Sequence, residues 1–181
     1  QNATDVWTQS YNAVYHLVDD PGTVEDFSDS GGCDFHGTNA VSASSGGAIA
    51  GGQYFEGDTE YLDWGSDQAF LNNASAATLS VWVNPDTVSG SGDILGVSRN
   101  DAGPTENSRA AIIRTGDNIA VYASTQDNFS DAVMVTTTTS PLTVGDWHHV
   151  TAAIDYANDT VKIYIDGVEQ ATSGIVSFSG T

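Results

Sequence analysis

Two adjacent histidines and the aspartates around them are the first candidates for chemistry. His148 and His149 open the segment HHVTAAIDYANDTVKIYIDG, which also carries Asp155 and Asp166. A zinc site needs several imidazole, thiolate or carboxylate ligands that converge on one ion. Neighbouring residues of a strand point to opposite faces of the sheet, so these two rings cannot share a metal. We expect each ring to be hydrogen-bonded at the sheet surface.

Paired carboxylates, as used by glycoside hydrolases, are the second candidate. The five glutamates stand at positions 25, 56, 60, 106 and 169, and Glu56 and Glu60 are the closest pair. They flank Gly57 and Asp58 across a predicted turn, which we interpret as a solvated hairpin tip rather than one face of a strand. No Gly-x-Ser-x-Gly or His-Glu-x-x-His pattern occurs either. The sequence therefore predicts a protein that is not an enzyme.

An acid-rich segment is better suited to a hard cation. Residues 19–39, DDPGTVEDFSDSGGCDFHGTN, carry short carboxylates among Gly and Ser, and Ca²⁺ takes about six to eight oxygen ligands. The spacing is not that of an EF-hand, and a solvated acidic loop is the alternative. We predict calcium as a cofactor, with these metal ligands: Asp20, Asp26, Asp29 and Asp34.

The charge balance restricts the partners. The chain has 24 acidic and 4 basic residues and a formal net charge of −20 at pH 7. Phosphate contacts need clustered Lys and Arg, so nucleic acid is excluded as a partner, and an anionic membrane surface would repel the protein. No apolar run is long enough to span a bilayer. Because self-repulsion is relieved by salt or bound cations, the composition indicates a saline or calcium-containing medium; acidity for solubility alone is the alternative.

The elements that must position these residues are strands. Short alternating or β-rich runs recur between Gly, Asn, Asp and Ser clusters, and no helical periodicity extends over three turns. Period two places Leu79, Val81 and Val83 on one face of a strand and Trp82 on the other. The expected strands are Ala13–Val18, Gly52–Phe55, Tyr61–Trp64, Thr78–Asn84, Asp93–Ser98, Ala110–Arg114, Ile119–Ala123, Ala132–Thr137, His148–Asp155, Thr160–Asp166 and Glu169–Thr172.

Turn signals decide how these strands are connected. Asp166-Gly167 supplies the positive φ angles of a two-residue hairpin, and the Gly- and Ser-rich stretch from Ser42 to Gly52 is expected to be a long surface connection. Strands at this density predict an all-β fold, a two-sheet antiparallel jelly-roll sandwich, in one domain over residues 1–181.

Four segments resemble the laminin-G-like or concanavalin A-like lectin and glucanase superfamily. They are YNAVYHLVDD, FEGDTEYLDW, ATLSVWVNPDTVSGSGDILGVS and WHHVTAAIDYANDTVKIYIDGVEQ. The resemblance implies a jelly-roll module of a longer secreted or cell-surface protein, often with calcium and often binding glycans, without catalysis. The family pattern continues with a further strand, so the chain is expected to be a fragment short of its last strand.

Glycan contact and glycosylation give the remaining candidate residues. Exposed aromatic rings stack on sugars while Asp and Asn hydrogen-bond to hydroxyls; we predict Trp64, Tyr61 and Asp58 as ligand-binding residues, with Tyr54 and Phe129 as further platforms. Asn-x-Ser/Thr sequons fit glycosylation of an exported protein. They stand at Asn2, Asn73, Asn128 and Asn158.

Three functions follow from these observations. The first is a non-catalytic recognition or adhesion module, extracellular or at the cell surface, stabilised by calcium and binding a glycan or another surface ligand. The second is a structural subunit of a filament or surface layer, in which a neighbouring chain completes the sheet by strand complementation. The third, a polysaccharide-cleaving enzyme, lacks an evident acidic pair.

Overall fold

The computed structural model describes residues 11, 14, 15, 17, 23–24, 37–40, 43–49, 51–55, 61–63, 71, 74–97, 109–125 and 131–178. Their backbone forms fourteen strands, and no α-helix occurs among them. The chain divides into two compact units, Gln1–Ser66 and Asp67–Thr181. The single domain over 1–181 stays a prediction.

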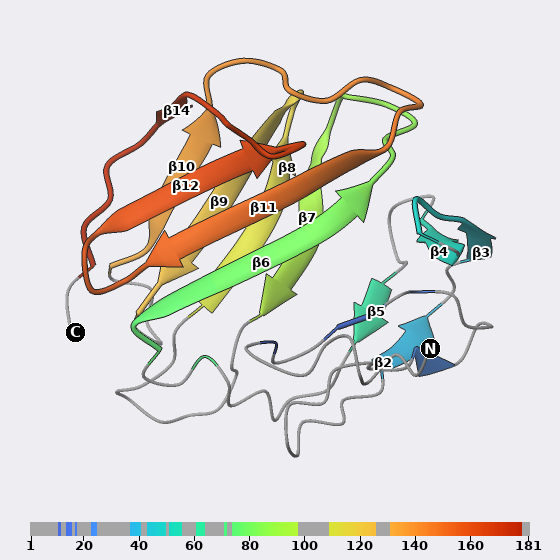
Figure 1. Ribbon diagram of the computed structural model, residues 1–181, viewed down its shortest axis with the longest axis horizontal. Helices are drawn as coiled ribbons and strands as arrows, with labels where there is room; N and C mark the ends of the chain where they lie inside the picture. Colours follow the sequence, from blue (N-terminus) through green and yellow to red (C-terminus); the bar gives the residue numbers. More distant parts are fainter. Residues whose placement is uncertain are drawn as a thin grey trace. The chain divides into compact units, whose positions relative to one another are not determined.

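The first unit contains five short strands in two antiparallel sheets. The three-stranded sheet has the order β1-β2-β5, and β3 pairs with β4 as a hairpin (Figure 1). Their bounds are β1 Thr23–Val24, β2 Gly37–Ala40, β3 Ala43–Gly46, β4 Gly51–Tyr54 and β5 Tyr61–Asp63.

The hairpin β3–β4 corrects the expectation for the Gly- and Ser-rich stretch. The described residues 43–49 and 51–52 are not an open connection, because Ala43 pairs with Tyr54 and Gly46 pairs with Gly51. A Cβ atom at Gly47 would collide with the carbonyl oxygen of Gly51, so the tight turn requires glycine there. The hydrogen bonds between paired strands use backbone atoms alone, so Gly and Ser can form them. Because these small side chains do not alternate between apolar and polar, the sequence gives no sign of a strand here.

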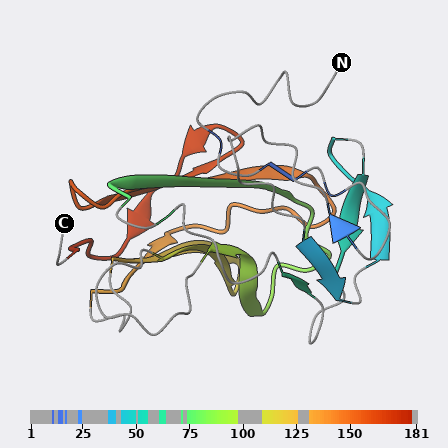
Figure 2. The same ribbon diagram turned by 90° about the horizontal axis from the view of Figure 1, so that it is seen from below.

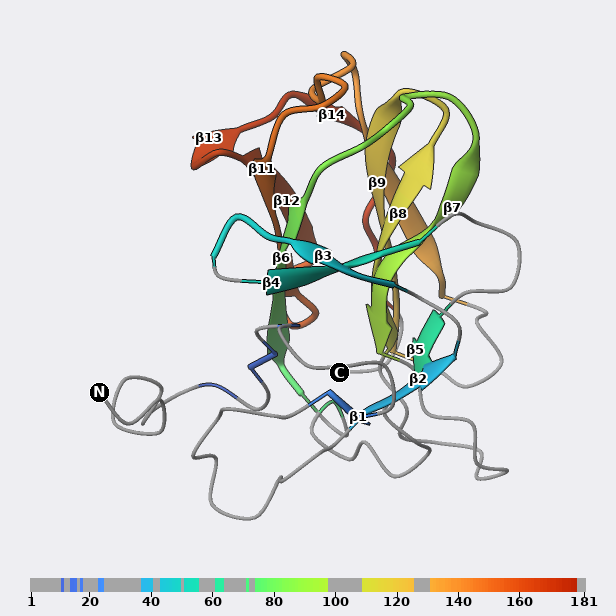
Figure 3. The ribbon, with the colours of Figure 1, turned by 90° about the vertical axis from the view of Figure 1, so that its right-hand side faces the viewer.

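The second unit is a two-sheet sandwich. One sheet has four antiparallel strands in the order β13-β12-β11-β6, and the other has five in the order β14-β10-β9-β8-β7. Figures 2 and 3 show the two sheets as stacked layers. Their bounds are β6 Ala76–Val83, β7 Ser91–Val97, β8 Arg109–Thr115, β9 Asn118–Ser124, β10 Val133–Thr137, β11 His148–Asp155, β12 Thr160–Ile165, β13 Val168–Glu169 and β14 Thr172–Ser173. The predicted all-β, two-sheet antiparallel jelly-roll sandwich is confirmed.

The core lies between these sheets, and on β6 and β12 it takes every second side chain, whereas β8 and β9 bury consecutive residues such as Ala110–Ile112 and Ile119–Val121. On β12, Val161, Ile163 and Ile165 are buried, whereas Lys162 is exposed and Tyr164 is partly buried. On β6, Leu79 is buried and Trp82 is exposed, as the period-two pattern predicts. The buried cluster consists of Leu71, Leu79, Ala110, Ile112, Ile119, Val121, Ala123, Val133, Val135, Leu142, Val150, Ala152, Ile154, Tyr156, Val161, Ile163, Ile165 and Phe178.

The predicted strand Glu169–Thr172 is wrong, because its two ends belong to different strands in different sheets. β13 ends at Glu169 on the four-stranded sheet, and β14 begins at Thr172 on the five-stranded sheet. The chain therefore crosses from one layer to the other within residues 170–171. A run of residues with strand propensity carries no signal for such a change of sheet, because both halves are extended.

Candidate functional site

The Asp166–Gly167 turn organises the polar end of the four-stranded sheet. Both residues have positive φ, 52° and 79°, as a two-residue hairpin between β12 and β13 requires. The backbone N–H of Asp166 donates to the carbonyl oxygen of His149 at 2.9 Å. In return, the Asp166 Oδ1 accepts from the backbone N–H of His149 at 2.8 Å. The carboxylate thus extends the β11–β12 ladder by one pair beyond Val150 and Ile165.

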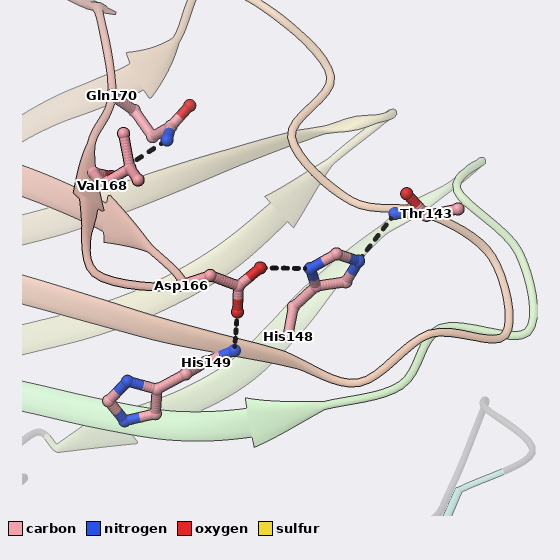
Figure 4. Close-up of polar contacts among 6 residues, drawn as sticks. All are labelled: Thr143, His148, His149, Asp166, Val168 and Gln170. Atoms are coloured by element: carbon pink, nitrogen blue, oxygen red, sulfur yellow. Dashed lines mark hydrogen bonds and ion pairs between the residues drawn. The ribbon is translucent and has the colours of Figure 1, made fainter.

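His148 is fixed by the other oxygen of the same carboxylate. Its Nδ1 lies 2.8 Å from the Asp166 Oδ2, and its Nε2 lies 3.0 Å from the backbone nitrogen of Thr143 (Figure 4). An N–H group can only donate, so Nε2 must be the acceptor and the proton resides on Nδ1. His148 is therefore a neutral imidazole that ties the loop before β11 to the β12–β13 turn.

His149 points away from His148 and belongs to the outer face (Figure 4). Its ring lies against Trp82 on the neighbouring strand, with centroids 5.0 Å apart and planes at 39°. Its Nε2 lies 3.3 Å from the Ser80 Oγ. The two histidines thus have separate partners, as the strand geometry predicts. The sequence places Trp82 on the outer face but gives it no role, and an exposed tryptophan at an outward strand position is the signal that was available.

Polar side chains continue this outer face along the sheet. Thr151 pairs with Ser80 on β6 and with Tyr164 on β12, and Tyr164 pairs with Glu169 on β13. Lys162 donates to the Glu169 Oε2 at 3.2 Å, and this hydrogen bond raises the pKa of Lys162. Both side chains are about half exposed, so the pair contributes little to stability. The face therefore combines hydroxyls, carboxylates and aromatic rings in solvent.

The electrostatics of Asp166 follow from its donors. The backbone hydrogen bond from His149, followed by the hydrogen bond from the His148 ring, lowers the pKa of Asp166 below that of an ordinary aspartate. Both donors favour the ionised carboxylate. Asp166 is consequently an anion at neutral pH.

The Asp166–His148 pair resembles the carboxylate–imidazole part of a hydrolytic triad, but its arrangement does not provide a base. In a triad, the distal ring nitrogen faces a nucleophile and takes its proton. Here the distal nitrogen of His148 is occupied by the N–H of Thr143. The pair is suited to holding chain segments together.

Another carboxylate, which is buried, links the end of β9 to the residues just before β10. Asp131 is 6% exposed, and it accepts hydrogen bonds from the Ser124 hydroxyl at 2.6 Å and from the backbone nitrogen and the hydroxyl of Thr125. The buried phenol of Tyr156 has its pKa raised by desolvation and then by the charge of Asp131. Since donors from two residues surround this carboxylate, we assign it a structural role.

The predicted metal site lies outside the described residues. Its four proposed ligands are Asp20, Asp26, Asp29 and Asp34. Within the part of the chain that the structure describes, no group of three or more His, Cys, Asp or Glu side chains is placed to hold a metal ion. The calcium assignment therefore stays a prediction.

The predicted ligand-binding residues are also largely outside the described part. Trp64, Asp58 and Phe129 fall there, together with Glu56 and Glu60. Tyr61 is in β5, opposite Ala40, but only its backbone is described. Tyr54 ends β4 and is 42% exposed.

One predicted glycosylation residue can be placed. Asn158 is exposed in the turn between β11 and β12, where its side-chain amide donates to the Asp155 Oδ2 at 2.8 Å. The sequons at Asn2, Asn73 and Asn128 begin outside the described residues. Glycosylation at all four stays a prediction.

No helix among the described residues has the length and apolar character needed to cross a membrane.

Comparisons with known proteins give one match. The family model Laminin_G_3, described as concanavalin A-like lectin/glucanases superfamily, matches residues 55–180, which is more than half of the chain. The matched range contains both sheets of the sandwich and three of the four segments that carry the resemblance, while YNAVYHLVDD lies before it. Comparisons with curated proteins and with solved structures found no match.

The Asp166 contacts predict a pH-dependent contribution to stability. In Asp166→Asn the side chain can accept only through one oxygen, so we expect the free energy of unfolding at pH 7 to fall by about 1 kcal/mol. Because the folded-state pKa of Asp166 lies below the unfolded value, the contribution is fully present above about pH 3.9 and is lost as pH falls through the lowered value. Urea denaturation at pH 7 and near pH 3 measures both effects.

Asp86→Asn is the matched control, since it removes the same charge from an exposed loop position. We expect it to change the free energy of unfolding by less than about 0.5 kcal/mol at either pH. Equal losses in the two variants at pH 7, or a loss for Asp166→Asn that persists unchanged in acid, would contradict the assignment.

Proposed function

The chain belongs to the concanavalin A-like lectin/glucanases superfamily, and from this membership we propose that it is a non-catalytic recognition or adhesion module of a secreted or cell-surface protein. The superfamily supports a carbohydrate-binding or adhesion-type module in general. Its two-sheet fold buries the inner faces of both sheets and leaves the outer face of the four-stranded sheet for ligands, with Ser80, Trp82 and Lys162 exposed on it.

One observation carries the non-catalytic part of the proposal. The His148–Asp166 pair, which has the composition of an acid–base pair, has both ring nitrogens and both carboxylate oxygens occupied by partners within the chain. Glu169 is the only glutamate among the described residues, and it is paired with Lys162. Retaining and inverting glycosidases need two carboxyl groups facing each other, about 5 to 9.5 Å apart. The described surface therefore supports binding rather than hydrolysis.

The charge supports an extracellular, salt-containing environment. A net charge of −20 on 181 residues repels itself strongly in dilute solution. Salt near 0.15 M screens such repulsion beyond about 8 Å. A secreted or surface-exposed protein in a saline medium meets that condition, and the exposed sequon at Asn158 is accessible to glycosylation there.

The proposal predicts retention on polysaccharide without turnover. The purified protein should sediment with insoluble glucan or agarose particles, or with whole cells that display glycans, and should release no new reducing ends from β-glucan or agarose. Co-sedimentation and a reducing-sugar assay measure the two properties. Sustained release of reducing ends that disappears in Glu56→Gln or Glu60→Gln would show an enzyme and overturn the proposal.

Calcium is proposed as the stabilising cation. Support comes from the concentration of short carboxylates in residues 19–39 and from the cost of holding like charges together without a counterion. The chemistry that Ca²⁺ would supply is charge neutralisation and cross-linking of loop oxygens. The residues proposed to hold it are Asp20, Asp26, Asp29 and Asp34.

Calcium should raise the melting temperature beyond the effect of ionic strength. A site that binds only the folded state stabilises it by about 2.7 kcal/mol when Ca²⁺ is a hundredfold above Kd. Thermal unfolding is followed in CaCl₂, in MgCl₂ and in NaCl at equal ionic strength, and after chelation. The calcium-specific increment should vanish in Asp26→Asn/Asp29→Asn and persist in the control Asp86→Asn/Asp117→Asn. Equal melting temperatures in the three salts would contradict calcium binding.

A structural subunit is the second candidate, favoured by one edge of the sandwich. β6 has eight residues and pairs with β11, and within the described part of the chain it has no partner on its other side. The other edge strands are protected, because β13 and β14 have two residues each and β7 has a register shift between Asp93 and Leu95. A strand from another chain could extend the sheet at β6.

Molar mass in solution separates the two candidates. The recognition module is expected to be monomeric in light scattering over a hundredfold range of concentration. Polymers that are abolished by Ser80→Pro on β6, in a variant that retains its β-sheet spectrum, would favour the structural subunit.

A further inference from the structure

Two tryptophans are exposed at one end of the four-stranded sheet. Trp82, on β6, is 43% exposed, and Trp147, one residue before β11, is 37% exposed. Burying a large apolar side chain stabilises a protein, and a tryptophan left in solvent does not make that contribution. The other outward positions of β6 carry small residues such as Thr78 and Ser80. A small side chain would therefore suffice at position 82 for the fold, and the tryptophan there calls for another explanation.

His149 contacts one of these tryptophans and lies two residues from the other. It stands directly opposite Trp82 in the β6–β11 register, and the two rings are in contact at 5.0 Å between centroids. Trp147 precedes His149 by two residues, which in an extended chain places both on the same side at roughly 7 Å between Cα atoms. The pair Trp82–His149 thus lies at the end of the outer face, and the strand period assigns Trp147 to the same side.

Hydrogen-bonding groups lie beside this pair at positions set by the strand register. Ser80, Thr151 and Tyr164 are opposite one another across β6, β11 and β12. The Asp166 carboxylate is 49% exposed at the neighbouring turn, and an ionised carboxylate has about four acceptor positions, of which the histidines use two. Apolar rings next to hydroxyls and a carboxylate match a pyranose, which presents C–H groups on its faces and hydroxyls around its rim.

The charges on the sheet restrict the sugar to an uncharged one. Lys162 is the only Lys or Arg in the four strands, and its ammonium group is already paired with Glu169. Cationic side chains form the strongest hydrogen bonds to sulfate and carboxylate groups, and the four strands offer no other such side chain. A chain of net charge −20 would in addition repel an anionic polymer.

We propose that Trp82, His149 and Trp147 form a stacking platform for an uncharged hexopyranose chain on the outer face of the four-stranded sheet. The inference rests on the proposed recognition function and deepens it by naming the surface and the ligand class. The rings stack on sugar faces, and the hydroxyls of Ser80 and Thr151 with the Asp166 carboxylate orient the sugar hydroxyls.

Native affinity electrophoresis tests the platform. Gels contain one soluble polysaccharide each, with mixed-linkage β-glucan, galactomannan, xyloglucan and low-melting agarose as neutral probes and dextran sulfate as the anionic probe. We expect at least one neutral probe to retard the wild type, and Trp82→Ala and His149→Ala to lower its affinity at least tenfold. Val168→Ala, a truncation of a side chain that is 63% exposed on β13 of the same sheet, should bind as the wild type does. Trp82→Phe, which keeps a ring, should retain part of the affinity.

The outcomes separate the platform from the proposed function. Each variant is first checked for an unchanged melting temperature, and Trp82→Phe replaces Trp82→Ala should the latter not fold. Retardation of the wild type that Trp82→Ala, Trp147→Ala and His149→Ala leave unchanged overturns the platform and leaves glycan recognition standing. Retardation by dextran sulfate alone overturns the ligand class. A wild type that no probe retards overturns both the platform and the glycan-binding part of the proposed function.

Discussion

The alternation of side chains along β6, β11 and β12 is the constraint on which the rest of the structure depends. Val150, Ala152 and Ile154 of β11 are almost completely buried against the five-stranded sheet, and a shift of one residue would expose them all. The same alternation fixes which residues face outward. The outer face is therefore rigidly specified by the core, although its own side chains contribute little to that core.

The polar end of this sheet shows how one carboxylate organises several segments. Asp166 completes the β11–β12 ladder through the backbone of His149 and, through the ring of His148, holds the loop that contains Thr143. The ring of His149 is thereby left to the outer face, where it lies against Trp82. A pair of residue types that occurs in hydrolases thus serves here to position an exposed aromatic surface, which accords with a recognition module.

Prediction from sequence succeeded where hydrophobic period and turn chemistry agree. The strand His148–Asp155 and the inward set Val161, Ile163 and Ile165 follow from period two, and Asp166-Gly167 specifies its hairpin. The strand β3 was missed because its Ala, Ser and Gly side chains have no such period. The acceptor role of Asp166 toward two histidines was not predicted, because it depends on the register of the β11–β12 hairpin and on the side-chain conformations at its end. The contact of Trp82 with His149 was overlooked because the two residues are far apart in sequence and become adjacent only when β6 pairs with β11.

The central claim is that the inner face of the four-stranded sheet holds the fold while its outer face meets the ligand. The most direct measurement is a set of ¹H–¹⁵N spectra of the labelled protein titrated with neutral hexose oligosaccharides derived from glucan, mannan and galactan. The account predicts that the largest shifts fall on the indole N–H groups of Trp82 and Trp147 and on the amides of β6 and β11 around Ser80 and His149. Shifts confined to the five-stranded sheet or to residues 19–39, with those indole signals unmoved, would contradict it.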